Sequence, residues 1–316
     1  MASALFIHGL SNKPEHGFLL DLYNRKLAFE DGLSFDTLNV TSSIIYWADV
    51  LYPSPDTDLA AYESVGAEIL QEGREAVVLD PRKIPADKLS PEEAAFIARM
   101  SAKVALGTED LDPALLTAEE RTELQYERIP MPAWLRNRLM AKLVRDAHLY
   151  FFNKEFTPRT GTTFMVRDEL RKRFLEALKA VKAEGRPAVV ISHSMGTMIA
   201  YDCLMHEPSC PEIQGLMTIG SPLGLDEVQD FFPRWSRENG FPAEKLKGPW
   251  VNVYDPLDPV AGADPKLAND YRQDGREVVE DVEEKNWGTW RHSISKYLQG
   301  RRLREKLASM LQVEWP

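Results

Sequence analysis

A serine stands between two small residues where an apolar run gives way to a helical pattern. The apolar run Val189–Ile191 predicts a buried strand, and it is followed by Ser192, His193, Ser194, Met195 and Gly196. Small residues two positions before and after a serine permit a sharp turn that lifts its hydroxyl above the sheet edge. The spacing predicts a nucleophile at Ser194, with the Met195 amide left to bind an oxyanion. A strand–helix turn without chemistry is the alternative interpretation of the same pattern.

A serine hydroxyl needs a histidine to take its proton and a carboxylate to orient that histidine. Only two histidines follow Ser194 in the chain, His206 and His292. His206 falls near the end of the helix that follows the turn, too far along it to fold back over Ser194. His292 lies in a loop before the last helical stretch, and we therefore predict it as the base.

The acid should come from a loop after a late strand, and two aspartates are available. Asp255 ends the run Trp250–Tyr254, and Asp258 follows three residues later. We favour Asp258, because the loop must carry the carboxylate across to the histidine. Asp255 would then shape the turn, and an Asx-turn is the alternative interpretation for either residue.

The N-terminal run Ala4–Ile7 ends in His8, Gly9 and Leu10, a second place where backbone amides can approach a substrate. We name the amides of Leu10 and Met195 as the two oxyanion donors. The His8 side chain precedes the serine on a different strand, so we expect it to organise the loop rather than act as a base.

The elements that must position these residues alternate between strand and helix. Strands are predicted over 4–7, 42–47, 187–191, 213–219 and 250–254, and helices over 18–29, 162–183, 196–205 and 294–311. Strand–helix–strand units build parallel sheets, so the fold class is α/β. The acidic stretch 280–284 reads as a solvated face.

Residues 53–159 have a different texture, in which helix signals replace strand signals. Ser90 with Glu93, and Thr117 with Glu120, form capping boxes, and Pro132 opens another helix. We therefore divide the chain into a core of 1–52 and 160–316 and a helical insertion of 53–159. Trp134, Leu135, Phe151 and Phe152 could line an apolar cleft, although packing of the insertion onto the core is the favoured interpretation. The apolar stretch 147–153 is expected to contact the core or a partner chain.

The motifs together resemble the lipase- and esterase-like members of the α/β-hydrolase family. The resemblance covers about two thirds of the chain and rests on Phe6–Leu10, Ser192–Gly196, Gly220–Gly224, Asp258–Val260 and His292. It implies a mainly parallel sheet with helices on both faces and a helical cap, and a catalytic triad of Ser194, Asp258 and His292. It also implies that no metal or organic cofactor is used, and that Gly9, His193 and Ser221 contact the substrate. Ser192 departs from the glycine usual in the family, and the family's first hairpin is missing.

The resemblance implies hydrolysis of a small-molecule carboxylic ester through an acyl-enzyme. The same triad could act on an amide, a thioester or a lactone, or pass the acyl group to an alcohol. A hydrolase-fold binding protein without activity is the alternative from a different class. The sequence leaves the natural substrate, the cap motion and the oligomeric state open.

The composition disfavours several classes of binding partner and cellular environment. Lys and Arg number 38 against 49 Asp and Glu, a formal charge of −11, which disfavours nucleic acid and anionic membranes. Two cysteines, Cys203 and Cys210, exclude a disulfide framework and make structural zinc improbable; we expect two thiols in a cytoplasmic protein. No apolar run approaches the roughly 18 residues that span a bilayer, and the N-terminus lacks the features of a signal peptide.

Overall fold

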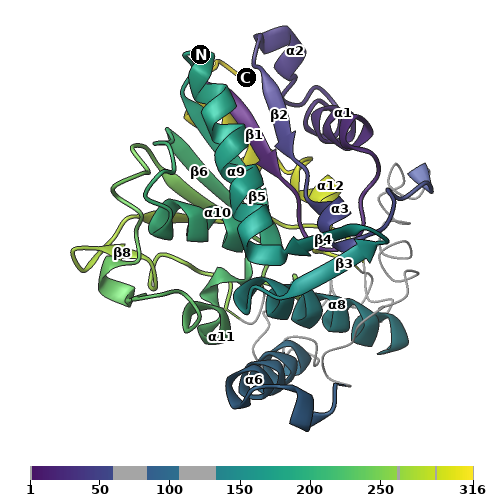
Figure 1. The fold of residues 1–316 in the computed structure, drawn as a ribbon. Helices are drawn as coiled ribbons and strands as arrows, with labels where there is room; N and C mark the ends of the chain where they lie inside the picture. Colours follow the sequence, from purple (N-terminus) through teal and green to yellow (C-terminus); the bar gives the residue numbers. More distant parts are fainter. Residues whose placement is uncertain (1, 60–83, 107–132, 262–263, 289, 316) are drawn as a thin grey trace.

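A six-stranded sheet forms the centre of the protein (Figure 1). The computed structural model describes residues 2–59, 84–106, 133–261, 264–288 and 290–315. The strand order is β10-β7-β6-β5-β1-β2, and every neighbouring pair runs parallel. The strands are β1 (Ser3–Ile7), β2 (Ser42–Ile45), β5 (Ala188–His193), β6 (Gly215–Ile219), β7 (Trp250–Tyr254) and β10 (Val279–Glu283). The α/β class and the parallel sheet are as predicted.

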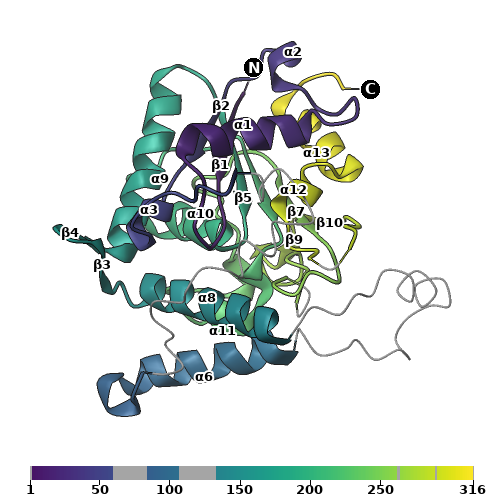
Figure 2. The ribbon, with the colours of Figure 1, turned by 90° about the vertical axis from the view of Figure 1, so that its right-hand side faces the viewer.

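Helices cover both faces of this sheet (Figure 2). The alternation along β5 explains the two layers, because Val190 joins one hydrophobic cluster while Val189 and Ile191 join the other. Helices α9 (Val166–Ala183) and α10 (Met195–His206) contribute to the first cluster, and α1 (His16–Leu27), α12 (Ile294–Tyr297) and α13 (Arg301–Leu311) to the second. Strands buried on both faces have nearly unbroken apolar sequences, and this pattern predicts β1, β5, β6 and β7.

Two further helices, α6 (Pro91–Leu106) and α8 (Ala133–Phe151), pack together at one end of the molecule (Figure 1). The predicted capping box before α6 is present: the Glu93 amide donates to Ser90 Oγ at 3.1 Å, and the Ser90 amide donates to Glu93 Oε2 at 2.9 Å. The stretch 147–153 contacts the core as expected, and Phe151 packs against Phe96 and Phe231. Thr117, Glu120 and Pro132 lie outside the described residues, as do the side chains of Trp134 and Leu135.

The remaining elements are short. They are α2 (Phe35–Leu38), α3 (Ala48–Leu51), α11 (Asp226–Gln229), the 3₁₀ turns Ala86–Lys88, Pro222–Gly224 and Arg237–Asn239, and the paired strands β3 (Glu155–Arg159) with β4 (Thr162–Met165) and β8 (Arg272–Gln273) with β9 (Arg276–Glu277). Among the described residues, no helix combines the length and apolar character needed to cross a membrane.

Three predicted elements differ from the structure. The acidic stretch 280–284 is not simply a solvated face, because most of it forms the edge strand β10, with Val279 and Val282 buried. The helix predicted from residue 162 begins at Val166, because Gly161 turns the chain with a φ of 78° and pairs β4 with β3. The final helical stretch is two helices, α12 and α13, separated by residues 298–300.

Candidate active site

Ser194 occupies the turn between β5 and α10. It has a φ of 52° and a ψ of −127°, a conformation that residues other than glycine seldom adopt and that clusters at functional sites. Its amide donates to the Ile219 carbonyl at 3.0 Å, and the Thr197 hydroxyl donates to the Ser194 carbonyl at 2.7 Å. These two contacts hold the backbone of the turn in its strained form.

Small residues on either side of Ser194 allow this turn. A Cβ atom at Gly196 would lie 2.7 Å from the His8 carbonyl oxygen and 2.9 Å from that of Ile7, so α10 could not approach β1 with a larger residue there. Ser192 is buried and donates to the Met217 carbonyl at 2.9 Å. The Ser192 hydroxyl is therefore satisfied within the sheet, and its side chain is small enough to stand two residues before Ser194.

His292 and Asp258 form a buried pair. His292 Nδ1 lies 2.9 Å from each carboxyl oxygen of Asp258, and neither side chain is more than 2% exposed. Because a carboxylate only accepts, Nδ1 carries the proton and Nε2 is left as an acceptor. Both His292 Nε2 and Ser194 Oγ are buried without a hydrogen-bond partner among the described residues. An acceptor and a hydroxyl donor are therefore both left unused at this site.

Asp258 is held ionised by its surroundings. Burial alone would raise its pKa, but the charge interaction and hydrogen bond with His292 outweigh it, together with the Val260 amide and the Tyr297 hydroxyl. The amide donates at 2.8 Å and the hydroxyl also at 2.8 Å. The net result is a lowered pKa, so Asp258 is charged at neutral pH and orients His292.

Asp255 has different partners. One carboxyl oxygen accepts from the Leu257 amide at 2.7 Å, and the other accepts from the Asn286 amide at 2.7 Å and from Arg291 at 3.3 Å. The carboxylate thus shapes its own turn and ties it to the loop before His292. Of the two candidate acids, Asp258 is the one that meets His292.

The loop after β6 brings Ser194 and the His292–Asp258 pair together. Ile219 bonds the Ser194 amide, and the next residue, Gly220, has a φ of 52°. A Cβ atom there would lie 2.8 Å from Asp258 Oδ2 and 3.1 Å from His292 Nδ1. Glycine at this position therefore lets the pair approach the Ser194 turn.

The loop that follows β1 also borders the Ser194 turn. A Cβ atom at Gly9 would lie 2.7 Å from Ser194 Cβ, so the backbone of Gly9 passes directly beside the serine, and buried Leu10 follows it in the chain. Met195 is the first residue of α10, and amides of a first helical turn have no acceptor within the helix. The two predicted oxyanion donors thus belong to segments that border Ser194.

His8 organises this loop, as the sequence predicts. Its Nδ1 donates to the Gly9 carbonyl at 2.8 Å, and its Nε2 accepts from the Trp47 amide at 3.0 Å. Burial, followed by the charge of Lys13, holds the pKa of His8 well below its usual range. His8 is therefore a neutral structural residue.

The other predicted residues are placed as follows. The Ser221 hydroxyl pairs with that of Thr197 at 2.8 Å and accepts from the Leu223 amide at 3.2 Å, so it ties the β6 loop to α10. His206 ends α10, where it bonds Asp202 and the Pro233 carbonyl, away from Ser194 as expected.

Sequence reasoning missed Tyr297. Its hydroxyl donates to Asp258 Oδ2 at 2.8 Å and accepts from the Asp255 amide at 2.8 Å, so it fixes both aspartates. The residue follows His292 by five positions in a helical pattern, and such a pattern signals packing rather than a hydrogen bond.

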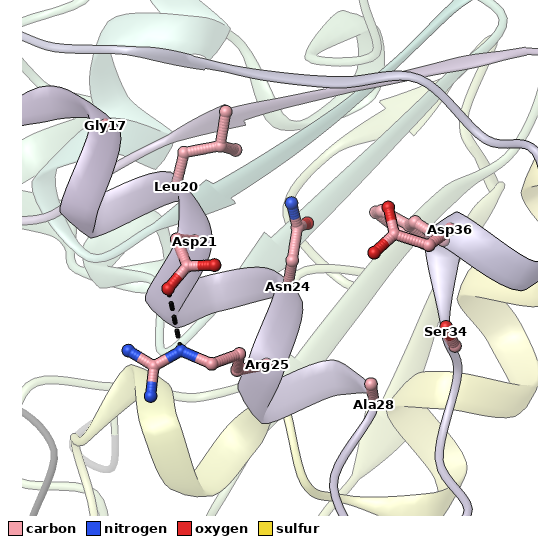
Figure 3. Close-up of a pocket in the computed structure, with 9 residues that line it drawn as sticks. Gly17, Leu20, Asp21, Asn24, Arg25, Ala28, Ser34 and Asp36 are labelled. Atoms are coloured by element: carbon pink, nitrogen blue, oxygen red, sulfur yellow. Dashed lines mark hydrogen bonds and ion pairs between the residues drawn. The ribbon is translucent and has the colours of Figure 1, made fainter.

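A surface hollow of about 300 Å³ lies elsewhere, between α1 and α2 (Figure 3). Its lining includes Asn24, Ser34 and an exposed Arg25–Asp21 ion pair of 2.8 Å, and none of the predicted site residues. In the described part of the chain, no group of three or more His, Cys, Asp or Glu residues could hold a metal ion. The buried Ser194 site, and not this hollow, carries the groups suited to chemistry.

The arrangement can support nucleophilic chemistry, because a strained serine, an oriented histidine and the Gly9 backbone meet around the turn after β6, although no hydrogen bond joins Ser194 Oγ to His292 Nε2. Comparison with known proteins adds no assignment: neither a family model nor a curated protein matches this chain.

Proposed function

We propose that this protein is a serine hydrolase of the α/β-hydrolase fold that cleaves a carboxylic ester. One observation carries the proposal. Ser194 Oγ and His292 Nε2 are buried and unpartnered among the described residues, while His292 Nδ1 bonds Asp258. Buried polar groups without partners cost stability, and such costs persist where a reaction uses the groups.

In the first half of the reaction, Ser194 Oγ attacks the carbonyl carbon of the ester as His292 Nε2 takes the hydroxyl proton. The Leu10 and Met195 amides bind the oxygen that becomes negative. Asp258 stabilises the positive charge on the imidazole. The C–O bond to the leaving group then breaks, and His292 returns the proton to the departing alcohol.

In the second half, water attacks the acyl-enzyme while His292 Nε2 accepts a proton from it. The bond to Ser194 Oγ breaks, the proton goes to the serine oxygen, and the carboxylic acid leaves. The free enzyme is regenerated. These steps consume only ester and water.

Labelling with a small fluorophosphonate tests the proposal. We expect one adduct on the wild-type protein by intact mass and none on Ser194→Ala, because phosphonylation requires an activated serine. A folded wild-type protein that gains no adduct would overturn the proposal and favour a binding protein. If the wild-type protein is labelled, assays of matched ester, amide, thioester and lactone substrates identify which bond it cleaves.

A further inference from the structure

His193, the residue before the nucleophile, lies between two parts of the site. Its Nε2 lies 3.0 Å from the His292 carbonyl oxygen, and its ring lies against the His292 ring with centroids 4.7 Å apart and an angle of 31°. On another side, a Cβ atom at Gly9 would come within 2.8 Å of His193 Nδ1. The imidazole thus touches both the base and the loop of the predicted oxyanion donor.

The partners of His193 fix its tautomer. A carbonyl oxygen only accepts, so Nε2 carries the proton and donates a hydrogen bond to the main-chain carbonyl oxygen of His292. Nδ1 is then an acceptor, and it is buried without a hydrogen-bond partner among the described residues. Burial, followed by the charge of His292 and then that of Lys13, lowers the pKa of His193 well below its usual range. His193 is therefore neutral at neutral pH.

We propose that His193 is a positioning residue, which holds the main chain of His292 and the Gly9 loop at their working separation from Ser194. Asp258 fixes the imidazole of His292 through Nδ1, while Asn286 and Lys296 hold the carbonyl oxygens of Arg291 and Trp290 earlier in the loop. The His193 bond to the carbonyl oxygen restrains the backbone. The Asp258 contact at the ring and the His193 contact at the main chain are the two that act on His292 itself. This inference rests on the proposed function.

Two substitutions of His193 distinguish the role of its N–H donor from that of its aromatic ring. His193→Gln retains an N–H at about the distance of Nε2, whereas His193→Phe retains the ring and removes the donor. Misplacement of catalytic groups by about 1 Å can cost about 10²-fold in rate. We expect the Phe variant to lose about 10²-fold in the rate constant of fluorophosphonate labelling and in kcat, with little change in KM. The Gln variant should stay within about tenfold of wild type.

His206→Phe is the matched control. His206 also lies on the β5–α10 unit and also has its Nε2 3.0 Å from a backbone carbonyl oxygen, that of Pro233. It does not contact Ser194 or His292, so labelling of this variant should proceed at the wild-type rate. Thermal unfolding of each variant establishes that the fold persists.

A second readout does not depend on activity. The proton shared by His292 Nδ1 and Asp258 should give a far-downfield proton resonance, which Asp258→Asn removes. We expect this resonance to persist in His193→Gln and to broaden in His193→Phe. Unchanged labelling and an unchanged resonance in the Phe variant would overturn the inference, as would a loss confined to KM. Absence of an adduct on wild type would overturn the proposed function, while the resonance would still decide the role of His193.

Discussion

At the residue scale, Asp255 and Asp258 differ in what they touch although only three positions separate them. Asp258 meets His292 Nδ1, whereas Asp255 holds backbone amides and Arg291. We expect Asp258→Asn to lower kcat by about 10⁴-fold, because an amide favours the wrong tautomer of the histidine. Steady-state ester hydrolysis, with circular dichroism to verify the fold, measures this.

Asp255→Asn provides the comparison. It weakens the contact between the turn and the loop before His292, so we expect a loss of unfolding free energy of about 1–3 kcal/mol and a smaller loss of kcat. Urea unfolding gives the first quantity. A larger fall in kcat for Asp255→Asn than for Asp258→Asn would show that the acid is misassigned.

The sequence predicts those site residues that can be recognised from a local pattern or from their order along the chain. Ser194 stands in a distinctive turn pattern, and His292 is the one later histidine in a suitable loop. The sequence favours Asp258 over Asp255 only through its place in the loop, because both aspartates follow the same strand. Tyr297 could not be foreseen, since the reach of its hydroxyl to Asp258 depends on how α12 packs against the β7 loop.

At the element scale, the turn after β6 limits how closely the His292–Asp258 pair can approach Ser194. Gly220→Ala would add a methyl group 2.8 Å from Asp258 Oδ2, in a backbone with a φ of 52°. We expect kcat to fall by about 10²-fold as the pair is displaced. Gly185→Ala, at a φ of 73° with no atom within 4 Å, should cost about 1 kcal/mol of backbone strain and leave kcat unchanged. Equal kcat in both variants would contradict this account.

The contact between α6 and α8 should depend on pH through Glu93. Burial alone would raise its pKa, but hydrogen bonds from Lys154, the Ser90 amide and His148 lower it from 4.5 to about 2. A lowered pKa contributes stability above the unfolded value, and this contribution is lost as the pH falls from 4.5 towards 2. At pH 7 we expect Glu93→Gln to cost on the order of 2 kcal/mol in unfolding free energy.

Urea unfolding of wild type and Glu93→Gln between pH 7 and about pH 3 measures this difference. The two unfolding free energies should converge as the pH is lowered through that range. A difference that stays constant with pH would mean that the charge of Glu93 does not stabilise the α6–α8 contact.

The sequence predicts strands whose residues are mostly apolar, but it does not predict the strand β10, in which apolar and acidic residues are mixed. β1, β5, β6 and β7 are buried along their whole length and mostly apolar, whereas β10, at the edge of the same sheet, combines two buried valines with three acidic residues. Asp281 uses both carboxyl oxygens to accept from the Leu267 and Ala268 amides, a role that a run of acidic residues does not reveal. The acidic residues of β10 therefore do not predict a strand, and its extended structure comes from pairing with β7.

At the scale of the whole molecule, the site depends on the sheet as a common base. Ser194 follows β5, Gly9 follows β1, Gly220 follows β6 and Asp258 follows β7. The carboxyl ends of parallel strands lie at one edge of the sheet, so residues far apart in sequence meet there. The sequence pattern predicts most of the strands but not their order in the sheet, and that order sets how far apart these residues lie.

The two cysteines offer a probe of the folded molecule as a whole. Both are free and buried, Cys203 within α10 and Cys210 after it. Burial raises the pKa of Cys210 to about 12 and that of Cys203 well above its usual range. Since the thiolate is the reacting form, we expect neither thiol to react with iodoacetamide in the native protein.

Both thiols should become reactive together in urea, over the same concentration range in which circular dichroism reports unfolding. That result is expected because Cys203 packs in the cluster that joins α10 to the sheet, so its exposure requires the core to open. Single variants Cys203→Ala and Cys210→Ala assign each modification by mass. Rapid modification of Cys203 in native protein would mean that α10, and with it the Ser194 turn, opens without unfolding of the sheet.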